Sequence, residues 1–186
     1  MWFVVSVPIF LASVLGWTFT QIGAFLALWV IGYGGVQGFA PVLLRKITRD
    51  RSPGPGLASG LALILAAVTA LIPVGLGFGA SPSLTMLGGL GLFGVAFALN
   101  SAVHSYLVLA YSEADRVSLS VGFYYMANAA GRLMGTLLSG VLYQTAGVTA
   151  SLWGAVVLAT TAGVVAMFLP PVAATEVSWA AAKGED

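Results

Sequence analysis

One stretch decides the fold, Val121-Gly-Phe-Tyr-Tyr-Met-Ala-Asn-Ala-Ala-Gly-Arg-Leu-Met-Gly-Thr136. It is a long apolar segment with a single cation, Arg132, near its middle. Ser118 lies about 21 Å before Arg132 at helical rise, and Gly147 lies about as far beyond it. A charge at that depth in a membrane is costly and rarely survives without a partner or a water-filled cavity. The stretch therefore predicts a membrane helix and suggests an anionic substrate.

The composition around this stretch is that of an integral membrane protein. Of the 186 residues, 59% are hydrophobic and 7% are charged, whereas soluble domains carry about 25% charged residues. A soluble domain of this length keeps a large surface and cannot hide so much apolar sequence. A net charge of +1 with scattered basic residues offers no face for nucleic acid, and the absence of cysteine excludes disulfides and thiolate metal sites.

Six apolar segments approach the roughly 20 residues that a spanning helix needs. They cover residues 2–15, 21–44, 57–79, 84–111, 118–144 and 149–169. We therefore expect an all-α integral membrane protein with six transmembrane helices, in which residues 1–170 form one bundle and residues 171–186 form a cytoplasmic tail. The basic residues of the loop 45–56 place it in the cytoplasm by the positive-inside rule. Alternation then places both termini there, in a multi-pass protein of the cell inner (plasma) membrane.

Glycine and the polar side chains predict how the helices face each other. Small residues let helices approach closely in lipid, so we expect contacts at the glycines spaced four apart, with sliding contacts of a moving transporter as the alternative. These are the pairs 34 and 38, 56 and 60, 75 and 79, and 131 and 135. The third and sixth segments contain only Ser and Thr as polar residues, which predicts that these two face lipid most.

Three segments each carry a pair of polar residues four apart, on one helix face. Asn128 precedes Arg132, with Tyr125 nearby. The other pairs are Tyr33 with Gln37, and Asn100 with His104. Together they resemble a cavity wall. The alternatives are ordinary packing for the tyrosines, a satisfied hydrogen-bonder for His104, and an Arg132 held by hydroxyls and carbonyls or by an acid on an absent segment.

Motifs of enzymes are missing from the sequence. One histidine allows no HExxH pair and no metal cluster, and no glycine-rich phosphate loop ends in Gly-Lys-Ser/Thr. No Asp or Glu lies in any of the six segments, so no Ser-His-Asp set is assembled at depth. We expect neither catalysis nor a cofactor.

Six helices, a basic loop after the second and a cytoplasmic tail resemble the C-terminal half of a major facilitator superfamily transporter. More specifically, the chain resembles the organoarsenical efflux permeases of arsenic-resistance operons, the ArsJ family. The residues that carry this resemblance are Trp2-Phe-Val-Val with Pro8-Ile-Phe-Leu11, Phe25-Leu-Ala-Leu-Trp-Val-Ile-Gly-Tyr-Gly34 with Val36-Gln37 and Ala40-Pro41, and Gly122-Phe-Tyr-Tyr-Met-Ala-Asn-Ala-Ala-Gly-Arg-Leu133 with Gly135-Thr136 and Leu138-Ser139-Gly140.

The resemblance implies one half of a twelve-helix fold that exports 1-arseno-3-phosphoglycerate, the product of a partner glyceraldehyde-3-phosphate dehydrogenase. A member of the family carries six further helices before Trp2, so the resemblance implies a fragment, a split gene or a wrongly read start. The expected partners are an anionic small molecule, the lipid bilayer, and the missing N-terminal half or a second copy. The alternatives are a permease half for another organic anion and a non-transporting membrane assembly subunit.

Overall fold

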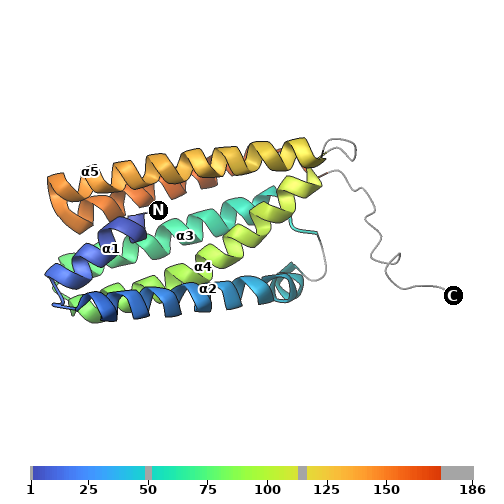
Figure 1. Ribbon diagram of the computed structural model, residues 1–186. Coiled ribbons are helices and arrows are strands. Elements are labelled where there is room, and N and C mark those ends of the chain that lie inside the picture. The colour runs from blue at the N-terminus through green and yellow to red at the C-terminus, as the bar shows by residue number, and fades with distance from the viewer. Residues whose placement is uncertain (1, 49–51, 113–116, 173–186) are drawn as a thin grey trace.

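The computed structural model describes residues 2–48, 52–112 and 117–172, and these form five helical elements (Figure 1). They are α1 (Trp2–Ser13), α2 (Phe19–Thr48), α3 (Pro55–Gly77), α4 (Pro82–Ala110) and α5 (Val117–Ala166). The prediction of an all-α membrane protein is confirmed in that α2, α3, α4 and α5 are each long and apolar enough to cross a membrane. The predicted tail from residue 173 onward lies outside the described residues, as do Arg49 and Arg51 of the basic loop.

The prediction of six separate spanning helices is not met, for two reasons. The 12 residues of α1 reach about 18 Å, which is less than the roughly 30 Å of a bilayer core. The fifth predicted segment and all but the last three residues of the sixth lie within α5, whose backbone leaves the helical conformation at Ala146 and Gly147. The φ of Gly147 is 72°, a value that glycine adopts without the steric penalty of a Cβ.

This turn folds α5 back on itself. Its first arm covers residues 117–145 and its second arm covers residues 148–166. Ser151 Oγ donates a hydrogen bond of 2.8 Å to the carbonyl oxygen of Ser139, and Figure 1 shows the two arms antiparallel. The predicted segment boundaries at residues 144 and 149 therefore flank the turn that the structure contains.

The ends of α3 and α4 follow from local sequence signals. Pro55 and Pro82 each stand in the first turn, where a missing N–H costs nothing. At the C-terminus of α3, the Gly79 N–H donates to the Leu76 carbonyl at 3.2 Å, and the Ala80 N–H donates to the Gly75 carbonyl at 3.1 Å. With a φ of 75° at Gly79, this is a Schellman cap that satisfies carbonyls at the helix end.

The core lies around α3, and this corrects the prediction that the third segment faces lipid most. In its most apolar stretch 50% of residues are buried, against 6% in α2. Ser59 Oγ donates to the Gly163 carbonyl at 2.8 Å, which ties α3 to the second arm of α5. Lipid tails are as apolar as leucine, so low polarity does not tell a lipid-facing helix from one buried in protein.

Among the described residues, the glycine prediction is not met for most of the named pairs. A Cβ at Gly75 would lie 2.9 Å from Thr85 Cγ2, whereas at Gly34, Gly38 or Gly131 it would meet nothing within 4 Å, and the same is true at residues 56 and 60. The close approaches occur instead at glycines outside the four-residue pairs. These are Gly89, Gly94, Gly154 and Gly163.

Candidate functional site

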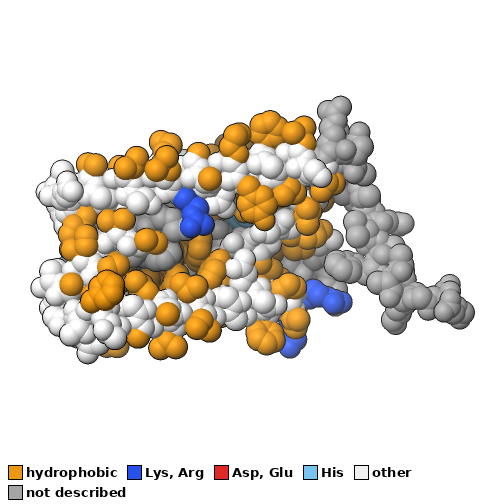
Figure 2. Space-filling model, in the orientation of Figure 1, with side chains coloured by type: hydrophobic (Ala, Val, Ile, Leu, Met, Phe, Trp, Pro, Cys, Tyr) orange, Lys and Arg blue, Asp and Glu red, His pale blue; other side chains and the backbone are white. Residues whose placement is uncertain are grey.

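The polar residues predicted from the sequence lie on α2, α4 and the first arm of α5. In Figure 1, α2 forms one edge of the visible face, the first arm of α5 forms the other, and α1 and α4 lie between them. Figure 2 shows that orange apolar side chains dominate the same face, with a basic patch about midway along α5 and further basic side chains near the end of α2. Arg132 is the single Lys or Arg of α5.

Arg132 lies at the centre of this arm and is exposed. Val117 at one end of the arm is about 22 Å away, and Ala146 at the turn is about 21 Å away. Every residue from 125 to 134 is exposed. No hydrogen bond or ion pair joins the Arg132 guanidinium to any residue that the structure describes. The structure therefore does not show the alternative, in which hydroxyls or carbonyls of the described chain bind this cation.

The described residues contain no carboxylate at all. The six acidic residues of the chain fall in the parts left undescribed, and they are Asp50, Glu113, Asp115, Glu176, Glu185 and Asp186. Within residues 2–48, 52–112 and 117–172, the arginine consequently has no counter-ion on any helix. Its five N–H donors form a planar fork that matches the oxygens of phosphate or carboxylate.

Asn128 and Tyr125 share the first arm of α5 with Arg132. Both are exposed, and the Tyr125 side chain has 66% of its surface accessible. The ring of Tyr125 makes an edge contact with Tyr124, with centroids 5.6 Å apart. The structure therefore places the three predicted residues of this arm on an open surface.

Asn100 and His104 are brought together on α4. His104 Nδ1 donates to the backbone carbonyl of Asn100 at 2.8 Å, because a carbonyl oxygen only accepts. Both side chains are half-buried. Asn100 Oδ1 is fully buried and has no hydrogen-bond partner in the described chain. An orphaned buried acceptor is uncommon and calls for an explanation.

Gln37 is half-buried on α2, and its neighbour Tyr33 belongs to an aromatic column that the sequence did not predict. The rings of Trp29, Tyr33, Phe93 and Phe97 stack between α2 and α4, with centroids 5.4–6.4 Å apart. Trp29 Nε1 also donates to the Leu90 carbonyl at 2.9 Å. The sequence did contain a signal for this column, because α2 and α4 each carry two aromatic residues four apart, a spacing that places both rings on one helix face.

Five of the six predicted residues lie in the same half of the molecule, and Arg132 lies at its middle. Measured along each helix from the end that Figure 1 shows on the side of the C-terminus, Arg132 lies about 22 Å deep and His104 about 9 Å deep. The other four lie between these depths, at about 12–16 Å, and are Tyr125, Asn100, Gln37 and Asn128. Apart from the bond between His104 and Asn100, the structure shows no direct bond that joins them.

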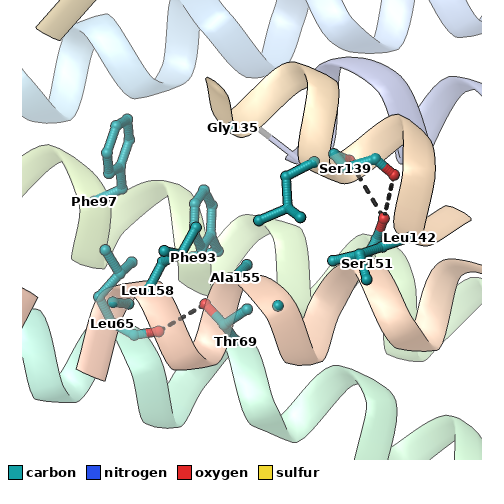
Figure 3. A pocket seen from close by; sticks show the side chains of 13 residues that line it. Leu65, Thr69, Phe93, Phe97, Gly135, Ser139, Leu142, Ser151, Ala155 and Leu158 are labelled. Atoms are coloured by element: carbon teal, nitrogen blue, oxygen red, sulfur yellow. Dashed lines mark hydrogen bonds between the residues drawn. The ribbon is translucent and has the colours of Figure 1, made fainter. Parts of the chain in front are cut away.

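A separate cavity of about 150 Å³ lies between α3, α4 and the two arms of α5, and none of the six predicted residues lines it (Figure 3). Its hydroxyl groups are already bonded. Thr69 Oγ1 donates to the Leu65 carbonyl at 2.7 Å, while Ser139 and Ser151 form a buried cluster with Ser6, with Oγ–Oγ distances of 2.9–3.3 Å. The sequence analysis missed this cluster.

The cavity and the rest of the described chain offer no metal site. Apart from these hydroxyl residues, the cavity is lined by leucine, phenylalanine, alanine and glycine, which have no polar side-chain atom. Among the described residues, no three His, Cys, Asp or Glu side chains are grouped to hold a metal ion. The cavity has no free donor for an anion, so the exposed face around Arg132 remains the candidate site.

Of three comparisons with known proteins, one supports a bundle of membrane helices. No match was found among curated proteins or among solved structures. The family model of the Major Facilitator Superfamily, a superfamily of transporters, matches residues 1–185. Since that match spans nearly the whole sequence and four of its helices can span a membrane, the chain is a multi-pass membrane protein that belongs to the Major Facilitator Superfamily.

Proposed function

We propose that the chain is the C-terminal half of a secondary efflux transporter for an organic anion, and that Arg132 binds the anion. The observation that carries this proposal is the exposed guanidinium about 22 Å from either end of its arm, with no carboxylate among the described residues. A cation at membrane depth without a counter-ion is stabilised by an anion that enters a water-filled cavity.

The remaining polar residues orient the substrate in this proposal. Asn128 and Tyr125 extend the surface on the same arm, Gln37 approaches from α2, and Asn100 with His104 approaches from α4. The substrate then lies at the level of the bilayer midplane, and rocking of one bundle against another exposes it to each side in turn.

The exposed face supports a partner in the membrane. The first arm of α5 exposes ten consecutive residues from 125 to 134, and α2 is almost unburied by the rest of the chain. The same face carries the exposed cation Arg132, which is costly against lipid and therefore favours a protein partner over bilayer contact. We propose that a second six-helix bundle covers it, supplied by the N-terminal half of the transporter or by a second copy.

The proposed substrate is an organoarsenical anion such as 1-arseno-3-phosphoglycerate. The resemblance of residues 122–133 to organoarsenical permeases supports this, as does an arginine fork suited to oxyanions. The absence of cysteine favours recognition of oxygen atoms over binding of trivalent arsenic by thiolates. Arg45 and Lys46 in the last turn of α2 support an inner-membrane protein with this end of α2 on the cytoplasmic side.

The test is export by cells that express the native gene. Arg132→Ala is expected to abolish export of the labelled organoarsenical, and Arg132→Lys to retain a fraction, because lysine keeps the charge but loses the fork. Leu137→Ala is the matched control on the same arm, since Leu137 is 62% exposed and carries no charge. Unchanged export by Arg132→Ala would remove the assigned role. Export of unrelated organic anions without the arsenical would keep the transporter and change its cargo.

A further inference from the structure

We propose that the cavity between α3, α4 and the two arms of α5 receives an apolar group of the transported anion, and that organic anions carrying one aryl ring are the preferred substrates. This inference rests on the proposed function, because Arg132 supplies the contact for the charged end. It adds a subsite and a substrate class: the ring enters the cavity, while the anionic group stays outside it. An organoarsenical anion without such a ring uses the polar contacts alone.

Arg132 and one wall of the cavity belong to a single face of the first arm of α5. Gly135, Ser139 and Leu142 line the cavity. The same alternation of four and three residues, continued toward the start of the arm, reaches Arg132 and then Asn128. Residues at this spacing share one helix face. Arg132 therefore lies one turn from the cavity wall, about 4.5 Å along the axis from Gly135.

The size and the lining of the cavity match one aromatic ring. Its volume is about 150 Å³, and an apolar cavity of about 150 Å³ stays dry and binds benzene. Phe93 and Phe97 of α4 line it (Figure 3), with ring centroids 5.5 Å apart. An aryl group gains edge or offset contacts with such rings in addition to the burial of its own surface.

The hydroxyl groups of the cavity favour an apolar occupant over a charged one. Thr69 Oγ1 donates to the Leu65 carbonyl at 2.7 Å, and Ser151 Oγ donates to the Ser139 carbonyl at 2.8 Å. Because these donors are already used within the chain, a charged group in the cavity would lose its water and gain no hydrogen bond in return. The substrate is therefore oriented with its ring in the cavity and its anionic group toward Arg132.

The cavity reaches the surface of the described chain. Leu138 on the first arm and Leu158 on the second arm both line it, and they are 41% and 52% exposed. A ring between the levels of Gly135 and Ser139 lies about 4.5–10.5 Å along the axis from Arg132. A linker of two carbons and the arginine side chain together span this gap, so one substrate molecule contacts both.

The experiment measures binding by titration calorimetry to the protein expressed from its native gene and purified in nanodiscs, with empty nanodiscs as the blank. The probes are 2-phenylethanesulfonate and ethanesulfonate, which carry the same charge and differ by one ring. Burial of a ring the size of a phenylalanine side chain raises affinity roughly tenfold to a hundredfold, so the aryl probe is expected to bind more tightly by this factor. Arg132→Ala is expected to weaken the binding of both probes.

Two variants on the second arm of α5 test the cavity itself. Ala155 lines the cavity, so Ala155→Leu places three more carbons there and should remove most of the advantage of the aryl probe, while ethanesulfonate binds as before. Ala162→Leu is the matched control, because Ala162 is exposed and does not line the cavity. Where Ala155→Leu does not fold, benzene gives the same test on the wild type: it should weaken binding of the aryl probe and leave ethanesulfonate unchanged.

The outcomes separate this inference from the proposed function. Equal affinities for the two probes, an advantage that survives in folded Ala155→Leu, or an aryl probe that benzene does not displace would overturn the inference and leave the proposed function standing. If Arg132→Ala loses ethanesulfonate but binds the aryl probe as the wild type does, the cavity and the arginine are separate sites and the inference fails. A wild type that binds neither probe refutes the proposed function itself.

Discussion

Gly89 on α4 is where the packing of the bundle is most sensitive to one added carbon. A Cβ at Gly89 would lie 2.8 Å from Ile72 Cδ1 and still closer to Ile72 Cγ1. Ile72 is 1% exposed, and its branched Cβ restricts it to few rotamers on a helix. The isoleucine has no room to move aside, so Gly89→Ala is expected to cost about 1–3 kcal/mol, the range for overpacked cores.

The neighbouring Gly88 supplies the matched control. Gly88 is exposed, and a Cβ there meets nothing within 4 Å. Gly88→Ala should be neutral or stabilising by up to about 1 kcal/mol, because alanine has the higher helix propensity. Both variants are compared by thermal unfolding in detergent, where each kcal/mol corresponds to about 2–4 °C for a chain of this size.

A double-mutant cycle identifies the contact itself. Ile72→Ala alone should cost about 2–5 kcal/mol through its cavity. Adding Gly89→Ala then fills part of that space, so the pair should cost less than the sum of the single changes by about 0.5–3 kcal/mol. Equal unfolding temperatures for Gly89→Ala and Gly88→Ala, or strict additivity with Ile72→Ala, would refute the close packing of α3 on α4.

Three further predictions concern buried polar groups. Ser151→Ala should lower stability by about 1–2 kcal/mol, because it removes the hydrogen bond that Ser151 accepts from Ser6 and the one that it donates to the Ser139 carbonyl, whereas Ser13→Ala on the exposed side of α1 should change the unfolding temperature little. Trp29→Phe keeps the stacked ring but loses the bond to a carbonyl of α4, so it should cost about 1 kcal/mol; an unfolding temperature equal to that of the wild type would show that this bond contributes nothing. Asn100→Leu removes a buried acceptor without a partner, so stability should stay level or rise while anion binding weakens; a loss of stability without a loss of binding would assign Asn100 to the fold alone.

The helix boundaries were predictable because their signals are local. Pro55 and Pro82 mark the starts of α3 and α4 within two residues of the predicted segments, and Gly79 and Gly147 mark turns. Each acts through its own backbone and needs no knowledge of a neighbour. The depth of Arg132 was predictable for the same reason, since it follows from counting residues along one helix.

Contacts between helices were not predictable, because they depend on the register of one helix against another. The aromatic column needs Trp29 and Tyr33 to lie level with Phe93 and Phe97, and no signal within either helix sets that level. The buried position of α3 was missed for a related reason. Inside a membrane, an apolar face packs equally well against lipid or protein, so hydrophobicity alone does not choose between them.

The distribution of hydrogen-bonding capacity supports the exposed face, and not the interior cavity, as the place where the proposed anion binds. Thr69, Ser139 and Ser151 are the polar side chains of that cavity, and each hydroxyl is already bonded within the chain. A charged ligand there would lose its water and gain no donors, which costs many kcal/mol. Arg132, in contrast, keeps all of its donors unbonded by the described residues and still accessible. Since an anion needs free donors more than it needs an enclosed space, this contrast supports the proposal that the substrate binds at the surface shared by α2, α4 and the first arm of α5.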